Sequence, residues 1–180
     1  MINFSRIKFA LIILLAVPAI TMASEPSTTP VPSSQQVGAT IGTTQANRQF
    51  MQRFVQFINT ADAQLASELV SSKAIFYVPG RPDPVSGPAG YLEIISMMRS
   101  GFPDIQWTLE ETIAEGDNIV ARYTMRGTHQ GAFMGVPPTG KKIAVQALNI
   151  YRFSNGQILE ELGQPDLLGL LQQIGGLPAR

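Results

Sequence analysis

The stretch that decides the fold is KIAVQALNIYRFSNGQILEELGQPD, residues 142–166. Two β-rich runs, Lys142 to Ser154 and Gln157 to Leu162, flank the dipeptide Asn155-Gly156. Asn-Gly is the strongest short-range hairpin signal, because both positions of a two-residue type I′ turn need a positive φ. The sequence therefore predicts two antiparallel strands joined by this tight turn.

A two-residue turn also fixes which side chains share a face of the hairpin. If Ser154 faces Gln157, the pairs on one face are Phe153 with Ile158, Tyr151 with Glu160, Asn149 with Leu162, Ala147 with Gln164, and Val145 with Asp166. This face begins apolar and ends polar. Its polar residues indicate a ligand pocket, although the solvated side of a sheet would carry the same residue types.

Composition indicates one globular domain with a substantial core. The chain has 180 residues, of which 44% are hydrophobic and 14% charged, and its formal net charge is zero. Its lysines and arginines are scattered, so we expect neither nucleic acid nor an anionic membrane surface as a partner. The absence of cysteine excludes disulfides, a thiol nucleophile and thiolate metal sites.

The N-terminus has the pattern of a leader followed by a linker. A basic start precedes an apolar stretch, residues 9–19, and small residues end at Ala23. Residues 1–23 are therefore predicted to be a signal peptide cleaved after Ala23, which makes the mature protein secreted or periplasmic without stable membrane insertion. The alternative is an uncleaved anchor, for which the stretch is short. Residues 24–45, rich in Ser, Thr and Pro, are predicted to be a flexible linker.

Residues 46–180 form the predicted domain, in which helical patterns come first and strand patterns follow. Helices are predicted over residues 47–59, 63–70, 89–100 and 167–174, and strands over residues 74–78, 105–114, 119–130 and the hairpin pair. This order favours an α+β fold, with helices covering one face of a curved antiparallel sheet.

Missing motifs narrow the chemistry that the domain can perform. The sequence has no glycine-rich phosphate loop, no Gly-x-Ser-x-Gly elbow and a single histidine. A histidine metal cage and a serine triad therefore lack parts, and we expect neither a cofactor nor a metal. Carboxylate and hydrogen-bond chemistry remains.

Asp166 is the first candidate for that chemistry, and it has two interpretations. A carboxylate at a strand end, beside apolar neighbours such as Leu168, would be partly desolvated and suited to act as a general acid and base. Alternatively, Asp is a preferred helix N-cap, and the helical pattern of residues 167–174 follows directly. The sequence leaves both interpretations open.

Three further polar residues could complete a catalytic site. In the expected register Asn149 and Tyr151 share the face of Asp166, where they could orient a substrate and donate to a developing oxyanion. His129 ends a long strand with the parity of Tyr123, so it could donate a proton in the same cavity or simply anchor a loop. The predicted substrate pocket is lined by Phe54, Phe57, Met98, Trp107, Tyr123, Phe133, Leu162 and Gln164.

From Gly87 to Gly176 a series of motifs resembles one known family. The motifs are Phe102-Pro103-Asp104, Ala114-Glu115-Gly116-Asp117, Gly127-Thr128-His129-Gln130-Gly131, Gly135-Val136-Pro137-Pro138-Thr139-Gly140-Lys141, Asn155-Gly156-Gln157-Ile158 and Asp166-Leu167-Leu168-Gly169-Leu170-Leu171-Gln172-Gln173. Their order and spacing are similar to those of the SnoaL-like polyketide cyclases, also called ester cyclases, within the superfamily similar to nuclear transport factor 2.

The resemblance implies a cone, in which a strongly bent antiparallel sheet wraps around three N-terminal helices and two cones usually dimerise through their sheets. In the cyclases that define the family, an aspartate at the position of Asp166 acts as acid and base in an intramolecular aldol closure of an aromatic polyketide ester, without a cofactor. The chain departs from the family pattern at Leu162, where a tryptophan is frequent, and at Pro165, where an aromatic residue is frequent.

These observations together predict an exported homodimer that binds a small, largely apolar carbonyl compound. If the protein is an enzyme, we expect aldol-type cyclisation or isomerisation by acid and base catalysis. The alternative is a binding or dimerisation module of the same fold without catalytic activity.

Overall fold

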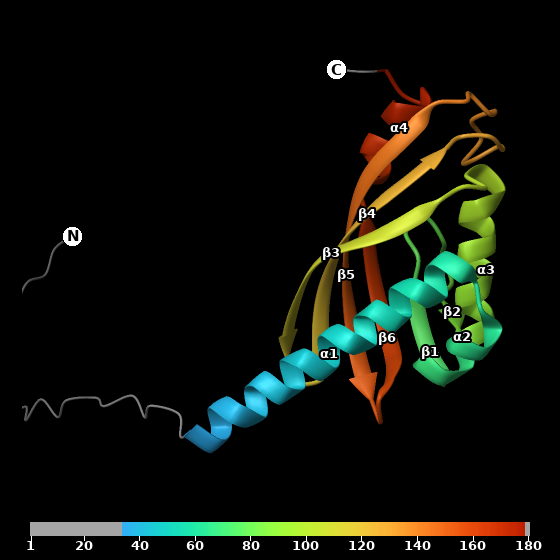
Figure 1. The fold of residues 1–180 in the computed structure, drawn as a ribbon. Helices are drawn as coiled ribbons and strands as arrows, with labels where there is room; N and C mark the ends of the chain where they lie inside the picture. Colours follow the sequence, from blue (N-terminus) through green and yellow to red (C-terminus); the bar gives the residue numbers. More distant parts are fainter. Residues whose placement is uncertain (1–33, 179–180) are drawn as a thin grey trace, which may run out of the picture. The chain divides into compact units, whose positions relative to one another are not determined.

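The computed structural model describes residues 34–178. The predicted signal peptide and the first part of the predicted linker lie outside the described residues. The elements, drawn in Figure 1, are α1 (Ser34–Thr60), α2 (Ala63–Leu69), β1 (Val70–Tyr77), β2 (Val85–Ser86), α3 (Gly87–Gly101), β3 (Gln106–Glu115), β4 (Asn118–Thr128), β5 (Lys142–Ser154), β6 (Gln157–Pro165) and α4 (Leu167–Ile174). Among these described helices, none combines the length and apolar character needed to cross a membrane.

The order of helices and strands agrees with the sequence prediction, and the α+β fold class is confirmed. Two boundaries differ by four residues or more. Helix α1 begins at Ser34, inside the predicted linker. Once a helix has formed, each further turn residue adds one backbone hydrogen bond for the conformational entropy of one ordered residue, so the helix can extend beyond the residues that pack on the core. Strand β1 begins at Val70 rather than at Ala74, since the chain becomes extended at the C-cap of α2.

Within the described residues the strands form one curved sheet in the order β2-β1-β6-β5-β4-β3. Strands β3 to β6 are antiparallel neighbours, as predicted. Strand β1, however, runs parallel to β6, so the expectation of a purely antiparallel sheet is wrong at this junction. Most of the domain separates the two strands in sequence, which supplies the long connection that parallel neighbours require.

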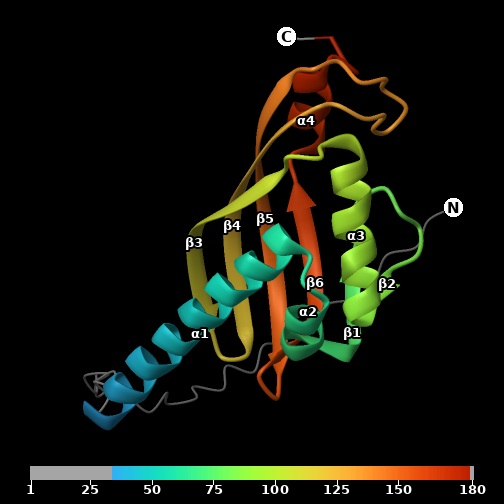
Figure 2. The same ribbon diagram turned by 45° about the vertical axis from the view of Figure 1, so that its right-hand side comes forward.

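Helices α1 and α3 lie on the same side of the sheet, as Figure 2 shows, and their apolar stripes fill the core. Phe54 and Phe57 of α1 are fully buried, and Ile95 of α3 is nearly so. Burying a side chain of this size contributes roughly 1.5–3 kcal/mol. The short helix α4 packs against β5 and buries Leu170 and Ile174 at one end of the sheet.

The β5–β6 hairpin contains a bulge that the sequence analysis does not foresee. Asn155 and Gly156 form the predicted turn with φ of 52° and 74°. The first two pairs, Ser154 with Gln157 and Phe153 with Ile158, are also as predicted. The next pair is Arg152 with Glu160, so Leu159 is an additional residue in β6 and forms a β-bulge.

Beyond the bulge the predicted register is wrong by one residue. Tyr151 faces Glu161, Asn149 faces Gly163 and Ala147 faces Pro165, and the predicted pairing of Val145 with Asp166 does not form. Because side chains alternate along a strand, a shift of one residue exchanges the two faces of β6. The inner face of the sheet therefore carries Glu161, while Glu160 pairs with Arg152 on the outer face at 3.1 Å.

Candidate active site

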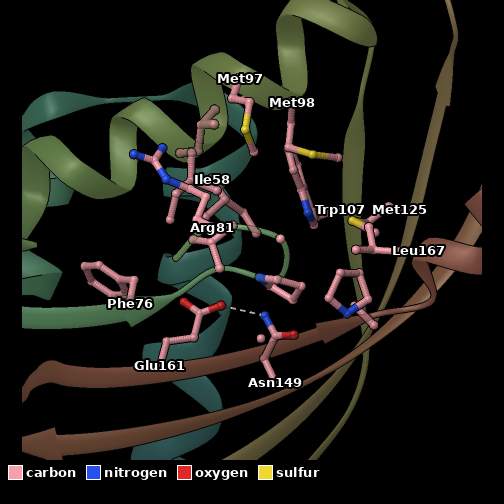
Figure 3. Close-up of a pocket in the computed structure, with 18 of the residues that line it drawn as sticks. Ile58, Phe76, Arg81, Met97, Met98, Trp107, Met125, Asn149, Glu161 and Leu167 are labelled. Carbon is pink, nitrogen blue, oxygen red and sulfur yellow. Dashed lines mark hydrogen bonds between the residues drawn. The ribbon is translucent and has the colours of Figure 1, made fainter. Parts of the chain in front are cut away.

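A cavity of about 400 Å³ lies between the inner face of the sheet and helix α3. Helices α1 and α4 close it through Ile58, Leu167 and Leu170. Figure 3 shows Glu161 and Asn149 projecting into the cavity from β6 and β5, towards a wall of apolar side chains. The apolar walls include Phe76, Ile94, Met97, Met98, Trp107 and Met125.

The mouth and the floor of this cavity differ in character. Met97 and Met134 line the cavity yet remain 36% and 54% exposed, so they mark its mouth. Two tyrosines of the floor, Tyr123 and Tyr151, are almost completely buried. A ligand that enters past the mouth therefore meets apolar walls first and polar groups at the floor.

Glu161 is the central polar group of the floor. Its carboxylate oxygen Oε1 accepts a hydrogen bond of 2.6 Å from Nδ2 of Asn149. The second oxygen, Oε2, is buried and has no hydrogen-bond partner among residues 34–178. A buried carboxylate oxygen without a partner is costly unless it is protonated or meets a ligand, so Glu161 has the environment of a reactive group rather than of a structural one.

Burial raises the pKa of Glu161 from 4.5 to about 7. The hydroxyl groups of Tyr91 and Tyr151 and the amide of Asn149 favour the ionised carboxylate and lower the pKa in part, but the loss of solvation dominates. Near neutral pH both the protonated and the ionised form are therefore populated. A general acid and base works best when its pKa lies near the working pH.

Three tyrosines surround the carboxylate. The hydroxyl of Tyr151 accepts from Asn149 at 3.1 Å and donates to the hydroxyl of Tyr123 at 3.2 Å. Burial, first, and the charge of Glu161 raise the pKa of Tyr91 and of Tyr151 well above the usual range, and burial likewise raises the pKa of Tyr123. All three therefore keep their protons and can serve as hydrogen-bond donors.

Small residues on the sheet make room for this polar cluster. In the strand register Asn149 lies between Ala121 of β4 and Gly163 of β6. A β-carbon at Gly163 would lie 3.5 Å from Oε1 of Glu161 and 3.7 Å from Oδ1 of Asn149. The absence of larger side chains beside Asn149 leaves a hollow in the inner face, and the polar groups occupy its floor.

Trp107 is fixed in the cavity wall by a side chain of helix α1. Asn59 donates to the backbone oxygen of Trp107 at 2.9 Å and accepts from its backbone nitrogen at 2.8 Å. The pair of bonds also covers the open edge of β3, the last strand of the sheet. Trp107 is the single tryptophan of the sequence, so its fluorescence reports on the cavity alone.

The structure brings six of the residues predicted for the site to this cavity. Asn149 and Tyr151 lie on its floor, and the others line its walls and base: Met98, Trp107, Tyr123 and Phe133. Phe54 and Phe57 lie behind this layer, because their rings pack against Tyr91 rather than facing the cavity. Their placement as lining residues is wrong, although Phe54 supports the floor through an edge contact with Tyr151.

The prediction of Leu162 and Gln164 as lining residues is also wrong. Leu162 is 42% exposed and pairs with Ile150, which is exposed as well. Gln164 is exposed and pairs with Leu148. The bulge at Leu159 is the physical reason, because it turns these residues to the outer face and brings Glu161 and Gly163 to the inner one.

His129 lies away from the cavity and anchors a loop. Its backbone exchanges hydrogen bonds with the segment around Lys141 and Gly140, at 2.8 Å each. Its ring is fully buried, contacts Oγ1 of Thr139 at 3.0 Å through Nδ1, and packs against Phe102. The loop-anchoring interpretation of His129 therefore agrees with the structure, and its proposed position in the cavity does not.

Asp166 is exposed at the start of α4 and does not line the cavity. Its Oδ1 accepts a 2.8 Å hydrogen bond from the backbone nitrogen of Gly169, and its backbone oxygen accepts from Leu170. These are the bonds of a helix N-cap. Of the two interpretations of Asp166, the structure supports the cap, and the environment expected of a buried acid is found at Glu161 instead.

Glu161 and Tyr91 are two polar cavity residues absent from the site predicted from the sequence. Tyr91 lies in the helix predicted over residues 89–100, and its side chain also lines the cavity from α3. In the expected register Glu160 shares the face of Asn149 and Tyr151, so Glu161 falls on the opposite face. A signal was nevertheless present: in the adjacent pair Glu160-Glu161 one side chain must face inward whichever register is adopted.

Comparison with known proteins places this cavity in a family context. A model of the SnoaL-like polyketide cyclase family matches residues 48–174. Nogalonic acid methyl ester cyclase of Streptomyces nogalater is 28% identical over 92 residues, which cover 50% of this chain and 68% of that protein. Aklanonic acid methyl ester cyclase of Streptomyces peucetius is 25% identical over 131 residues, which cover 69% of this chain and 88% of that protein.

Solved structures agree with this assignment of the fold. TsrD from Streptomyces laurentii superposes with a TM-score of 0.65 at 27% identity, over 73% of this chain and 96% of TsrD. IdmH from Streptomyces antibioticus superposes with a TM-score of 0.64 at 29% identity, over 71% of this chain and 97% of IdmH. The expected cone of bent sheet and helices is therefore the fold of this chain.

Proposed function

The chain belongs to the SnoaL-like polyketide cyclase family, and on that premise we propose that it catalyses cofactor-free proton transfer on a small, largely apolar carbonyl compound, with Glu161 as general base and acid. The observation that carries the proposal is a buried carboxylate whose free oxygen faces an apolar cavity. The relatives named as methyl ester cyclases of nogalonic and aklanonic acid support a cyclisation of the aldol type.

In the first step Oε2 of ionised Glu161 takes a proton from the carbon next to the substrate carbonyl. The C–H electron pair becomes part of an enolate, and its negative charge moves to the carbonyl oxygen. Because the pKa of Glu161 is about 7, roughly half of the molecules hold the required carboxylate at neutral pH. Asn149 holds Oε1, so the reactive oxygen points at the substrate.

A tyrosine beside Glu161 supplies the donor for the enolate oxygen. Tyr91 keeps its proton, so we assign its hydroxyl to a carbonyl oxygen bound beside the carboxylate, while Tyr151 donates to Tyr123. Donors already oriented in a dry site stabilise a developing oxyanion strongly. The enolate carbon then attacks a second carbonyl carbon of the substrate, and the protonated Glu161 returns its proton to the new alkoxide.

The proton-transfer step can be tested without knowledge of the natural substrate. We expect the full chain to catalyse deuterium exchange at the methyl group of 2-acetylnaphthalene, a neutral apolar ketone, in heavy water. Turnover of aklanonic acid methyl ester tests the ring closure itself. Binding of both compounds without exchange or turnover would contradict catalysis and would favour the alternative of a binding module.

We also propose that the mature protein is exported. The support is in the sequence, where a basic start, the apolar residues 9–19 and small residues before Ser24 form the pattern of a cleaved leader. N-terminal sequencing of protein collected outside the cytoplasm should find Ser24 as the first residue. An intact Met1 on the accumulated protein would contradict export by cleavage.

A third proposal is that two copies associate through the outer face of the sheet. One row of apolar side chains crosses five strands in register, from Tyr77 through Leu162, Ile150 and Val120 to Ile113. Four of them are exposed by 42–64%, with only Val120 half-buried. The ion pairs Arg122–Glu111 and Arg152–Glu160 flank the row, which suits a polar rim around an apolar interface.

A second copy of the chain is the occupant that fits this face, because an unbroken apolar row is self-complementary across a two-fold axis. Mass measurement across a dilution series should find a dimer, and Ile150→Lys should shift it to a monomer. Leu168→Lys changes an equally exposed apolar residue outside the row and should leave the dimer intact. A wild-type monomer at all concentrations would contradict the proposal.

A further inference from the structure

A chain of hydrogen bonds runs along the floor of the cavity and leads from Glu161 to Tyr123. The amide nitrogen of Asn149 donates to Oε1 of Glu161 at 2.6 Å and to the hydroxyl oxygen of Tyr151 at 3.1 Å. Tyr151 in turn donates its hydroxyl proton to the hydroxyl oxygen of Tyr123 at 3.2 Å. Since a phenol has one proton, Tyr151 serves as a donor to one neighbour at a time.

Two acceptors compete for the proton of Tyr151. One is the hydroxyl of Tyr123, which holds it, and the other is the carboxylate of Glu161. Burial, first, and the charge of Glu161 raise the pKa of Tyr151, and the hydroxyl of Tyr151 opposes the larger effect of burial on the pKa of Glu161. A hydrogen bond to a charged carboxylate is roughly twice as strong as one to a neutral oxygen. Without Tyr123 the proton would therefore turn to the carboxylate.

The other groups that face Glu161 leave Oε2 without a partner among residues 34–178. Tyr91 of α3 stays neutral, because burial, first, and the charge of Glu161 raise its pKa well above the usual range. Asn149 of β5 bonds to Oε1 instead. Arg81, the one cation among the described residues that line the cavity, is exposed and bound to Glu93 at 2.8 Å. Oε2 therefore stays uncovered only while the proton of the nearby floor tyrosine is held elsewhere.

We propose that Tyr123 is a positioning residue, which holds the hydroxyl proton of Tyr151 and so keeps Oε2 of Glu161 open to the substrate. The proposal rests on the proposed function in taking Oε2 as the oxygen that removes the substrate proton. Tyr123 and Tyr151 are only 1% and 0% exposed, so solvent does not compete for their hydroxyls. A hydroxyl bound to Oε2 would have the opposite effect, because it would stabilise the carboxylate and would have to be displaced before proton transfer.

Tyr123→Phe removes the acceptor and keeps the ring, so it tests the proposal in the full chain. We expect the pKa of Glu161, measured by NMR titration of the carboxyl carbons, to fall by about one pH unit. Deuterium exchange of 2-acetylnaphthalene should be about tenfold slower than in the wild type at about pH 9, where Glu161 is ionised in both proteins. At about pH 5 the two rates should agree within about twofold, because the larger ionised fraction of the variant offsets its weaker base.

Two further variants assign the effect to the tyrosine pair. In a chain that already carries Tyr151→Phe, adding Tyr123→Phe should leave the pKa of Glu161 unchanged, since no proton of Tyr151 remains to be redirected. Thr124→Val removes a hydroxyl from the next residue of β4, which bonds to Glu110 at 2.6 Å, and should behave as the wild type. Thermal melting checks that the variants are folded.

A measurement on the wild type tests the same proposal without any variant. In protein labelled at tyrosine, the NOE spectrum should connect the hydroxyl proton of Tyr151 with the ring of Tyr123. A hydroxyl proton of Tyr151 in contact with Glu161 instead would overturn the proposal.

The proposal would also be overturned by a pKa of Glu161 that stays or rises in Tyr123→Phe, or by an effect of Tyr123→Phe that persists beside Tyr151→Phe. An equal loss of exchange at about pH 5 and about pH 9 would show that Tyr123 only supports the fold. Because the titration needs no activity, a lowered pKa in a protein without exchange would count against the proposed catalysis alone. Exchange by the wild type with an unchanged pKa in Tyr123→Phe would count against the present proposal alone.

Discussion

Glu161 lies within β6 and Asp166 directly after this strand, five positions further on, yet their environments are opposite. Glu161 is buried on the inner face of β6, with one oxygen on Asn149 and the other free in the cavity. Asp166 is exposed one residue beyond the strand and caps α4. The difference shows that the bulge at Leu159 and the strand end, rather than proximity in sequence, decide which carboxylate becomes a reactive group.

The largest expected difference between the two carboxylates is in the exchange rate after each of them is neutralised in turn. Glu161→Gln should reduce deuterium exchange of 2-acetylnaphthalene by about 10²–10⁴-fold, because the amide cannot accept the proton. Asp166→Asn keeps a side chain that caps helices well and should leave the exchange rate within about twofold. The rates are measured by NMR on the full chain.

The reverse outcome, a large loss in Asp166→Asn with activity preserved in Glu161→Gln, would restore Asp166 as the acid and base. The same outcome would mean that the register of β6 in the active protein differs from the one described. Ligand quenching of Trp107 in both variants separates a loss of chemistry from a loss of binding.

A second expected effect is a pH dependence of the free energy of unfolding. The folded-state pKa of Glu161, about 7, lies above its ordinary value of 4.5, so between these values the folded state binds more protons than the unfolded state. The free energy of unfolding should therefore fall as pH rises from about 4.5 to about 7, by an amount on the order of 3 kcal/mol. Urea unfolding at several pH values measures the slope.

Glu161→Gln should remove this contribution, so that the variant matches the wild type near pH 4.5 and exceeds its stability at about pH 8. The matched control is Glu160→Gln, which should keep the wild-type slope because that side chain is partly exposed and paired with Arg152. Identical slopes in the wild type and Glu161→Gln would show that Glu161 ionises as an ordinary surface carboxylate.

A smaller effect should follow from Asn149→Leu. The amide of Asn149 favours the ionised form of Glu161, so its loss should raise the pKa of that carboxyl further. We expect the acid limb of the exchange-rate profile to move up by about one pH unit. Gln164→Leu, on the exposed outer face, should leave the profile in place. A downward shift for Asn149→Leu would contradict the role given to the amide.

The smallest effect is expected from removing the side chain of Asp166, the N-cap of α4. Asp166→Ala should destabilise the fold by about 1 kcal/mol, the usual cost of losing an N-cap, without changing the pH profile of exchange. Asp62→Ala is the matched case, since Asp62 caps α2 through the backbone nitrogens of Gln64 and Leu65. Melting temperatures of the two variants should fall by similar amounts; a change in the profile for Asp166→Ala alone would give that residue a further role.

Much of the fold could be predicted because its signals are local. The Asn155-Gly156 turn and the helices over residues 63–70 and 167–174 each follow from the chemistry of a few adjacent residues, and all agree with the structure within one residue. The parallel pairing of β1 with β6 could not be predicted in this way. It depends on contacts between segments far apart in sequence, for which no local pattern exists.

The candidate site was only half predictable, for a related reason. Asn149 and Tyr151 lie on β5, the strand that has no extra residue, and both were correctly predicted to line the cavity. On β6 an uninterrupted register from the turn places Leu162 on the inner face, and no residue type marks Leu159 as the extra one. Both faces of β6 carry a leucine and a glutamate in either register, so the residue types do not indicate a shift of one residue. The shift is seen only in the pairing of β6 with β5.

The most direct test of the central claim is the pKa of Glu161, measured by NMR titration of the carboxyl carbons in protein labelled at glutamate. The signal that disappears in Glu161→Gln, and persists in Glu160→Gln, identifies the residue. We predict a midpoint near 7, with the remaining glutamates as the internal reference. A midpoint at or below the ordinary 4.5 would contradict the assignment of Glu161 as the buried acid and base of this cavity.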